Sequence, residues 1–323
     1  MATLRELRDR IRSVSSTKQI TKAQEMIATS RITKAQQRVE AAAPYADELL
    51  RVVERLARES TLDNDMLRQR EDAKVAAVLV VTSDRGMCGG YNNSVLKKAA
   101  ALSKLLRDKG YEVDYYVAGD KGINYYRFRD IPVVATWSGF SQEPTWESTS
   151  GLIGHFVRGF QAGSEETVTH PNDKSAEVRG FDQLHVVYTE FVSMLEQKPR
   201  VQQVLPLEPV FDDDDDIDAG LKTADEDSDG ASANYEFEPD AQTLLDELLP
   251  KYVARSLFSM FLEASAAESA SRRTAMKNAT DNASELVEDL GREANQARQA
   301  QITQEISEIV GGAGALAGSG ESD

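Results

Sequence analysis

The sequence predicts an α/β protein with a long antiparallel two-helix coiled coil, formed by both termini, and a central open-sheet domain. Three observations support this fold class. Residues 252–310 contain one glycine and no proline, residues 3–60 form a comparable stretch at the other terminus, and strand and helix patterns alternate between them. A helix of about sixty residues measures roughly 90 Å. It needs a second long element to pack against, because isolated helices are marginally stable in water.

The N-terminal helix is predicted over residues 1–60. Its start has a capping-box pattern, Thr3-Leu4-Arg5-Glu6, and Pro44 is expected to kink it near its end. Apolar residues first follow heptad spacing, but the same frame then falls on polar residues while the apolar ones shift sideways to Ile20, Ala23 and Ile27. We expect the middle of this helix to leave its partner helix and to present Lys18 and Lys22 to another molecule. An ordinary exposed basic face is the alternative.

The central domain is predicted over residues 74–210 as a Rossmann-like sheet with right-handed connections, because strand and helix patterns alternate. A polar inserted loop is expected at residues 163–180. The strands are expected at 74–82, 111–118, 131–136, 182–191 and 201–207, and the helices at 92–109, 121–129 and 145–162.

An acidic, flexible loop is predicted over residues 211–240. It carries ten Asp and three Glu against one Lys, so most of the net charge of −17 lies here. Segments of this composition bury too little apolar surface to order themselves. Residues 1–40 are basic instead, with nine Lys or Arg against four acidic residues.

The C-terminal helix is predicted over residues 241–313, followed by a flexible tail at 314–323. We expect Asp240 to cap it and Pro250 to interrupt or kink it. Small residues at 263–271 suit close helix packing, whereas residues 295–305 are polar nearly all round and indicate partners outside this chain. The apolar tip that follows contains Ile302, Ile306, Ile309 and Val310.

Composition excludes several functional classes. A single cysteine, Cys88, precludes an internal disulfide framework and fits a reducing compartment. The N-terminus lacks an apolar leader and no apolar run is long enough to cross a bilayer, so we expect a soluble or peripheral protein. His155, His170 and His185 have no metal-ligand spacing and no nucleophile motif is present. We therefore expect no catalytic residue, cofactor, metal or nucleic-acid partner.

A glycine-rich turn at residues 83–92 joins the first strand to the first helix, where doubly wound folds hold phosphates. Its spacing is neither G-x-G-x-x-G nor G-x-x-x-x-G-K-[ST]. A tight packing corner is therefore favoured over a nucleotide loop. Cys88 in this turn is interpreted as a small buried thiol rather than as an activated one.

Three segments resemble motifs of one family, the γ subunit of F-type ATP synthases. They are RIRSVSSTKQITKAQEMIATSRITKAQ (10–36), VTSDRGMCGGYN (81–92), and the C-terminal pair ATDNASELVEDL (279–290) and ARQAQITQEISEIVGGA (297–313). They cover both helices and the sheet core in the family's order. Residues 291–295 and the insertion near 163–180 are similar to actinobacterial members.

The resemblance implies a non-catalytic central-stalk rotor of a proton-translocating enzyme, at the cytoplasmic face of the cell membrane. Its partners would be a hexamer of α and β subunits, the ε subunit and the c-ring, with the membrane reached only through the ring. The resemblance places Lys18, Lys22, Arg298, Gln299, Thr303 and Glu305 against β, with Ile306, Ile309 and Val310 as a bearing tip. It also implies that the glycine-rich turn holds no nucleotide.

Two other functions stay open at this point. One is a nucleotide-binding enzyme that uses the Ser83–Asn92 turn, and the other is a static coiled-coil scaffold. Tight ATP binding by the isolated protein would favour the first. Absence of ATP-driven rotation in a complex with α and β would favour the second. We also expect the polar insertion at 163–180 to contact a neighbouring rotor or ring subunit and to restrain hydrolysis.

Overall fold

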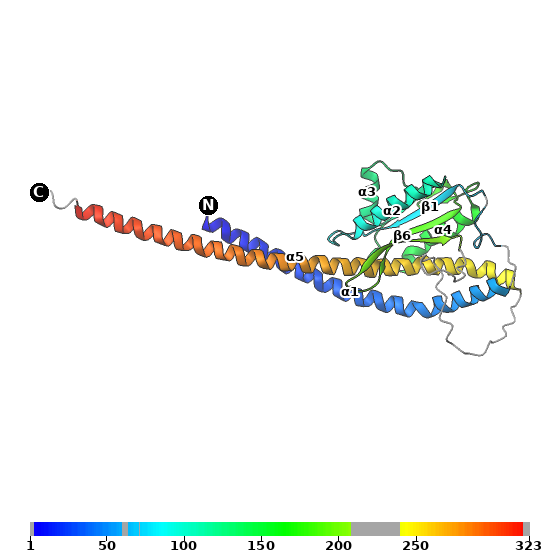
Figure 1. Cartoon of the computed structure of the whole chain (residues 1–323), viewed down its shortest axis with the longest axis horizontal. Coiled ribbons are helices and arrows are strands. Elements are labelled where there is room, and N and C mark those ends of the chain that lie inside the picture. The colour runs from blue at the N-terminus through cyan, green and yellow to red at the C-terminus, as the bar shows by residue number, and fades with distance from the viewer. Residues whose placement is uncertain (1–2, 60–63, 71, 208–239, 319–323) are drawn as a thin grey trace. The chain divides into compact units, whose positions relative to one another are not determined.

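The computed structural model describes residues 3–59, 64–70, 72–207 and 240–318. Most of the acidic loop and the last five residues therefore lie outside the described residues. The helices are α1 (Leu4–Glu59), α2 (Tyr91–Asp108), α3 (Asp120–Phe128), α4 (Trp146–Ala162) and α5 (Ala241–Gly318) (Figure 1). The strands are β1 (Val75–Val81), β2 (Glu112–Ala118), β3 (Ala135–Trp137), β4 (Thr167–His170), β5 (Asp173–Arg179), β6 (Gln183–Phe191) and β7 (Gln197–Leu205).

A five-stranded sheet in the order β3-β2-β1-β6-β7 forms the centre of the α/β domain. The β1–β2, β1–β6 and β2–β3 pairs are parallel, which confirms the predicted Rossmann-like open sheet. β7 pairs antiparallel with β6 because only a short turn joins them, and parallel strands need a longer crossover. Every residue of β1 is buried, as its continuous run of apolar residues predicts.

Two apolar clusters cover the two faces of this sheet. One combines alternate residues of β1 with α2, and includes Val78, Val95 and Tyr126. The other joins the opposite face of β1 to α4 and to both long helices, and includes Leu79, Phe156, Leu56 and Leu257. The ends of α1 and α5 that reach this second cluster thus belong to the core of the domain.

The segment at 163–180 differs from its prediction as a polar inserted loop. β4 and β5 pair into an antiparallel hairpin across residues 171–172. Arg179 holds the hairpin to β2, with its Nε 2.8 Å from Asp114 Oδ2, and Asn172 Nδ2 donates to the Thr136 carbonyl over 2.7 Å. Polar composition suggested a loop, but alternating exposure along β4 also fits a strand with one solvent face.

Prolines do not end either long helix. α1 continues past Pro44, and α5 begins at Ala241 and runs through Pro250, which we expected to interrupt or kink it. Leu249 and Val253 beside Pro250 are fully buried, and this packing maintains the helix despite the missing N–H. Asp240 caps α5 as predicted, because its Oδ1 accepts from the Thr243 N–H over 2.9 Å.

The third strand also differs from its prediction at residues 131–136. β3 spans Ala135–Trp137, and the apolar residues Ile131 and Val133 before it pack into the α2-side cluster without joining the ladder. The apolar character of residues 131–136 thus predicted that this segment is partly buried, but not which of its residues pair with β2.

Contacts divide the chain into two compact units. Unit 1 comprises residues 1–27 with 273–323, and unit 2 comprises residues 28–272. α1 and α5 each contribute to both units, and the whole α/β domain belongs to unit 2. The predicted division into five segments stays a prediction. Within the described residues, no helix is both long and apolar enough to span a membrane.

Candidate partner-binding surfaces

The helix pair of unit 1 has an antiparallel register defined by two buried threonines. Thr21 Oγ1 and Thr280 Oγ1 lie 2.7 Å apart and share a hydrogen bond. Figure 1 shows α1 and α5 running in opposite directions here. In an antiparallel pair the numbers of facing residues have a constant sum, so this register places Ile11 opposite Leu290 and Leu4 opposite Ala297.

The predicted sideways shift of the α1 seam is wrong. Thr21 is buried, whereas Ile20 is 59% and Ile27 53% exposed. The original heptad frame is therefore buried again at the polar residue Thr21, and α1 stays packed against α5 there. Each hydroxyl has a single proton, so one threonine donates to the other hydroxyl and the other donates to a carbonyl of its own helix, Lys18 O or Met276 O. Both buried hydroxyls are thereby satisfied.

Lys18 and Lys22 are both exposed on α1. Lys22 Nζ lies 3.1 Å from Glu25 Oε2, one turn later on the same helix. The predicted basic face therefore exists on the surface, but the Lys22 charge is partly balanced within the chain. Exposed pairs of this kind contribute little to stability, about 0–1 kcal/mol.

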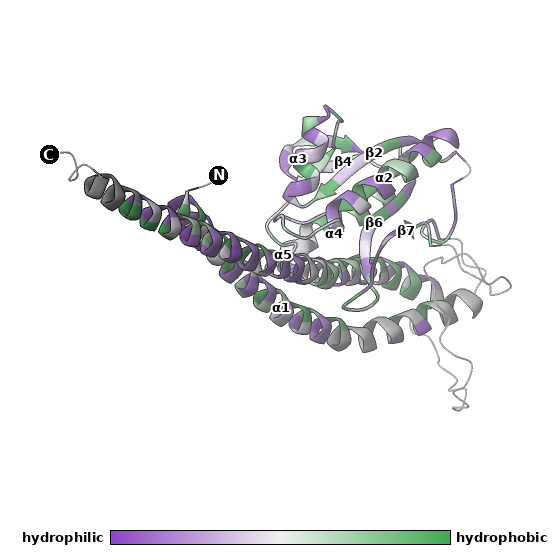
Figure 2. Ribbon diagram, turned by 60° about the vertical axis from the view of Figure 1, so that its left-hand side comes forward, coloured by the Kyte–Doolittle hydropathy of each residue, from purple (hydrophilic) through white to green (hydrophobic). Residues whose placement is uncertain are grey.

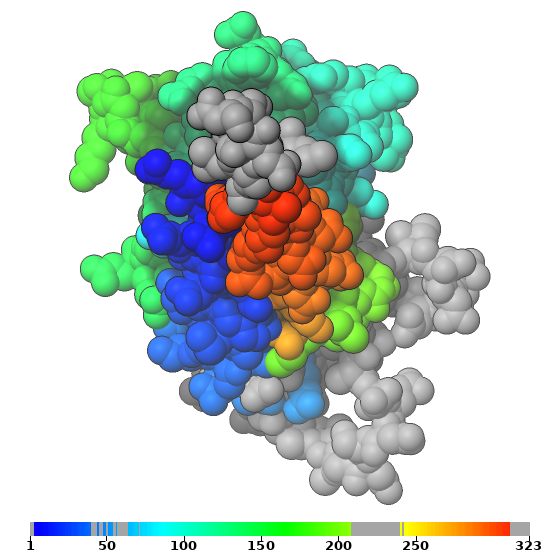
Figure 3. All heavy atoms as spheres, turned by 90° about the vertical axis from the view of Figure 1, so that its left-hand side faces the viewer, coloured from blue at the N-terminus to red at the C-terminus, as the bar shows by residue number. Residues whose placement is uncertain are grey.

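The segment of α5 from Arg298 to Val310 is exposed at every position. The register above reaches the first residue of α1 at Ala297, so this segment extends beyond the helix pair. Figure 3 shows its surface in orange to red, facing the viewer. The site residues Arg298, Gln299, Thr303 and Glu305, together with the tip residues Ile306, Ile309 and Val310, all lie on this segment.

Local hydrogen bonds occupy part of this surface. Thr303 Oγ1 donates to the Gln299 carbonyl over 2.9 Å, and Gln301 Nε2 donates to Glu305 Oε1 over 3.0 Å. Among the described residues, the Arg298 and Gln299 side chains have no hydrogen-bond or ion-pair partner. On this segment, the side chains of Arg298 and Gln299 are therefore fully available to another molecule.

An apolar stripe runs along the same segment. Ile302, Ile306 and Ile309 follow helical spacing and are 48%, 56% and 71% exposed. Figure 2 shows hydrophobic (green) and hydrophilic (purple) positions interspersed along this part of α5. Single exposed apolar residues are ordinary, but a contiguous stripe indicates an interaction surface.

The glycine-rich turn is a packing corner, as favoured by its spacing. Ser83 N–H donates to Asn92 Oδ1 over 2.9 Å, and Asn92 Nδ2 donates to Ser83 Oγ over 2.8 Å, which closes the turn on itself. Cys88 is buried, and burial raises the pKa of its thiol. Both observations fit the interpretation of Cys88 as a small structural residue.

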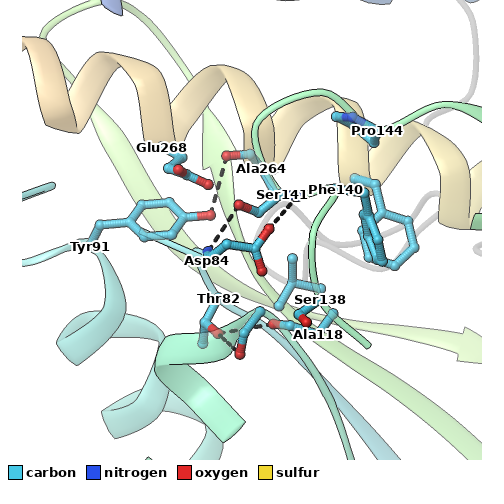
Figure 4. A pocket seen from close by; sticks show the side chains of 13 residues that line it. Thr82, Asp84, Tyr91, Ala118, Ser138, Phe140, Ser141, Pro144, Ala264 and Glu268 are labelled. Carbon is cyan, nitrogen blue, oxygen red and sulfur yellow. Dashed lines mark hydrogen bonds between the residues drawn. The ribbon is translucent and has the colours of Figure 1, made fainter. Parts of the chain in front are cut away.

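α5 also occupies the crevice where a doubly wound fold binds nucleotides. A narrow pocket at the carboxyl ends of β1 and β2 is lined by Thr82 and Asp84 from one side and by Phe261, Ala264 and Glu268 of α5 from the other. Figure 4 shows Glu268 and Tyr91 pointing toward this pocket. Helix atoms therefore stand where phosphates would bind, and the nucleotide-enzyme interpretation is not supported.

Sequence reasoning missed one charged pair, Glu268 and Arg272 of α5. Their side chains are 1% and 9% exposed, and Arg272 Nη2 lies 2.7 Å from Glu268 Oε1. The signal in the sequence was two opposite charges four residues apart beside the run of small residues predicted to pack closely.

Two histidines are buried in the α/β domain and favour their neutral form. Burial lowers the pKa of both His155 and His185 to about 4. His155 Nε2 lies 3.4 Å from Tyr116 Oη, and His185 Nε2 lies 3.0 Å from Gln183 Oε1. No group of three or more metal-ligating side chains occurs among the residues that the structure describes.

The fold and these surfaces define a class of protein: a subunit of a larger assembly, with a doubly wound domain, a terminal helix pair and an exposed helical extension. The sequence model of the ATP synthase family matches residues 3–316. The ATP synthase gamma chain of Corynebacterium efficiens is 63% identical over 327 residues, covering 100% of both chains. The chain therefore belongs to the ATP synthase gamma chain family, whose members are central-stalk subunits.

Solved structures show the same fold at low sequence identity. One chain from the Euglena gracilis mitochondrial ATP synthase, in an assembly described as OSCP/F1/c-ring, matches with a TM-score of 0.62 at 15% identity. The match covers 99% of this chain and 96% of that one. A chain from the rotor of the same enzyme matches with a TM-score of 0.59 at 15% identity, covering 93% and 98%.

Proposed function

We propose that this chain is the rotor of a proton-translocating F-type ATP synthase. It couples rotation of the membrane c-ring to the conformational cycle of the catalytic β subunits. The observation that carries this proposal is the segment from Arg298 to Val310, a helix exposed at every position and extending beyond its partner helix. A helix exposed all round is expected to be held by partners outside its own chain.

Asymmetry explains how such a helix acts on three similar subunits. A single helix with an apolar stripe and a separate polar face cannot contact three surrounding surfaces in the same way. Each third of a turn therefore changes which β subunit meets which face. A rigid element thus transmits coupling free energy between distant sites.

We assign roles to the site residues on the basis of their exposure and position on the helices. Arg298 and Gln299 offer unpaired polar groups, and Thr303 and Glu305 extend the same polar surface toward β-subunit loops. Lys18 and Lys22 face an acidic surface of β from α1. Ile306, Ile309 and Val310 form an apolar bearing tip inside the hexamer of α and β.

The remaining partners follow from the related assemblies. The Euglena gracilis relatives are described with F1, the c-ring and a rotor. We assign this chain the same surroundings: the α and β hexamer around its helices, with the ε subunit and the c-ring at the α/β domain. This places it at the cytoplasmic face of the cell membrane, where the c-ring provides its only link to the lipid.

Single-molecule rotation tests the proposal. The chain is assembled with α and β subunits in a three-to-three-to-one complex, and a bead is attached to the α/β domain. Addition of ATP is expected to rotate the bead in one direction in steps of a third of a turn. A bead that stays still in an ATP-hydrolysing complex would identify the chain as a static scaffold.

A further inference from the structure

We propose that the buried Glu268–Arg272 pair is a torque-bearing joint, which prevents α5 from turning about its own axis against the α/β domain. The proposal rests on the rotor function above, because that function requires torque to pass between this domain and the helices. It assigns Glu268 and Arg272 as positioning residues.

The helix surface immediately before Arg272 consists mostly of small residues and is tightly enclosed. Every residue of α5 from Met260 to Ala270 is buried except Glu263, and Ala264, Ala267 and Ala270 are among the most buried. Alanine side chains allow close approach, but they offer little resistance to rotation of a helix within its channel. Directional bonds at a distance from the helix axis supply that resistance.

Arg272 binds the glycine-rich turn that follows β1. Its Nη2 donates to the Arg85 carbonyl over 3.1 Å and to the Gly86 carbonyl over 3.3 Å, and its Nε donates to Gly86 O over 3.4 Å. A guanidinium has a planar array of donors, so several such bonds together define its orientation as well as its position. The turn thus holds α5 in one rotational setting.

Glu268 binds the loop that follows β3, near the same end of the sheet. Its Oε1 accepts from Gln142 Nε2 over 3.3 Å, and Ser265 Oγ donates to the Gln142 carbonyl over 2.8 Å. Arg31 of α1 donates to Gln142 Oε1 in turn. Tyr91 adds a further bond from its hydroxyl to the Ala264 carbonyl over 3.2 Å. Two loops, α2 and α1 are thereby connected to α5 between Ala264 and Arg272, a stretch of about two and a half helical turns.

Stability alone does not explain this pair. Glu268 Oε2 and Arg272 Nη1 are buried and find no hydrogen-bond partner among the described residues. Removing charges from water is costly, and replacing a buried ion pair by apolar residues is often neutral or stabilising. Both charged side chains keep one polar atom without a hydrogen bond, so their presence is not explained by stability. We attribute it to a mechanical requirement, resistance to rotation of the helix, that apolar contacts do not meet.

Rotation under load tests the joint. The double variant Glu268→Gln/Arg272→Met removes both charges with similar side-chain volumes. It is assembled with α and β subunits, and rotation of a bead on the α/β domain is measured as viscous load increases. We expect the double variant to rotate at the wild-type speed at the lowest load. Its speed should fall to half at a viscous load at least twofold smaller than the load that halves the wild-type speed. The control Asp289→Asn/Arg292→Met changes an exposed pair on α5 and should follow the wild type at every load.

Hydrogen exchange gives a second readout, independent of rotation. The backbone of residues 83–92 and 138–144 is expected to exchange at least tenfold faster in the double variant, with the sheet unchanged. Arg272→Lys serves as a second variant in case the double variant does not assemble. It keeps the positive charge but loses the planar array of donors, so it should show the same load sensitivity. The proposal would be overturned if either variant showed the same load dependence of rotation as the wild type. It would also be overturned if hydrogen exchange were unchanged in both loops of the double variant. A wild-type complex that hydrolyses ATP without rotating would instead overturn the rotor function, while the exchange measurement still tests the joint's contacts.

Discussion

The two ends of α5 are chemically opposite although they belong to one helix. From Met260 to Ala270 nearly every side chain is buried, and from Arg298 to Val310 every side chain is exposed. The buried end is rich in small residues, and its Glu268 forms an ion pair with Arg272. The exposed end has isoleucines, glutamines and a free arginine. The first end is stabilised by its own chain, whereas the second depends on helix propensity and local bonds.

This difference separates stability from function along a single element. Substitutions at the buried end should change the free energy of unfolding, because they create cavities or uncompensated polar groups. Substitutions at the exposed end should leave that energy almost unchanged and alter only what the assembled complex does. The following predictions test where one behaviour gives way to the other.

The largest effect is expected from Leu257→Ala at the buried end. Leu257 is fully buried in the cluster shared with the sheet, so truncation should lower the free energy of unfolding by about 2–5 kcal/mol. Ile306→Ala, the matched truncation at the exposed end, should change it by less than about 0.5 kcal/mol. Urea denaturation of both variants measures the contrast, which equal losses would contradict.

Acidification should destabilise the α/β domain through its two neutral histidines. The pKa of His155 and of His185 falls from 6.5 in the unfolded chain to about 4 in the folded one. The unfolded state therefore binds more protons below pH 6.5. Stability present above pH 6.5 is lost as the pH falls toward 4, by about 2–3 kcal/mol per histidine.

Denaturation at pH 7 and at pH 4.5 measures this loss. The variant His155→Gln/His185→Gln should show a smaller difference between the two pH values than the wild type. The exposed segment of α5 contains no histidine and should not share the effect. An identical pH dependence in the variant would show that other groups are responsible.

A smaller effect on the free energy of unfolding is expected at the threonine pair, which lies between the two regions of α5. Thr21→Val/Thr280→Val removes both hydroxyls and keeps their shape, so the free energy of unfolding should change by no more than about 1 kcal/mol in either direction. Polar residues at seam positions specify register at a cost in stability. A cysteine pair introduced at positions 11 and 290 should therefore form a disulfide less selectively in this background.

The smallest effect on stability is expected from Arg298→Ala/Gln299→Ala. Neither side chain has a partner among the described residues, so the free energy of unfolding should stay within about 0.5 kcal/mol of the wild type. Coupled ATP turnover in the assembled complex should fall roughly tenfold, which corresponds to one charge-assisted hydrogen bond of about 1.4 kcal/mol. Gln304→Ala/Glu308→Ala, at two residues bonded to each other, is the matched control. Unchanged turnover in the first variant would contradict the assigned roles.

Much of the fold was predictable because its signals are local. A continuous apolar run predicted buried β1, and Asp240 was recognisable as a helix cap from its residue type and position. The exposed end of α5 was also predictable, since a helix polar nearly all round has no face to bury. Each of these inferences uses residues within a few turns or one strand.

The errors share a different origin. The shift of the α1 seam was predicted because Thr21 was treated as a polar break, yet Thr280 pairs with its hydroxyl from 259 residues away. The insertion at 163–180 was predicted as a polar loop, although it forms a hairpin that contacts to Asp114 and Thr136 hold against the sheet. Both outcomes depend on partners that are distant in sequence.

By itself, the amino-acid sequence determined that both termini are long helices, that an open sheet lies between them, and that the family is that of ATP synthase gamma chains. Periodicity and motif order are properties of consecutive residues, so they need no knowledge of packing. Only the tertiary structure showed that α5 fills the crevice of the sheet and that Arg272 donates hydrogen bonds to the turn after β1. Those facts depend on which surfaces meet, because a buried charge acquires its role only from the groups that surround it.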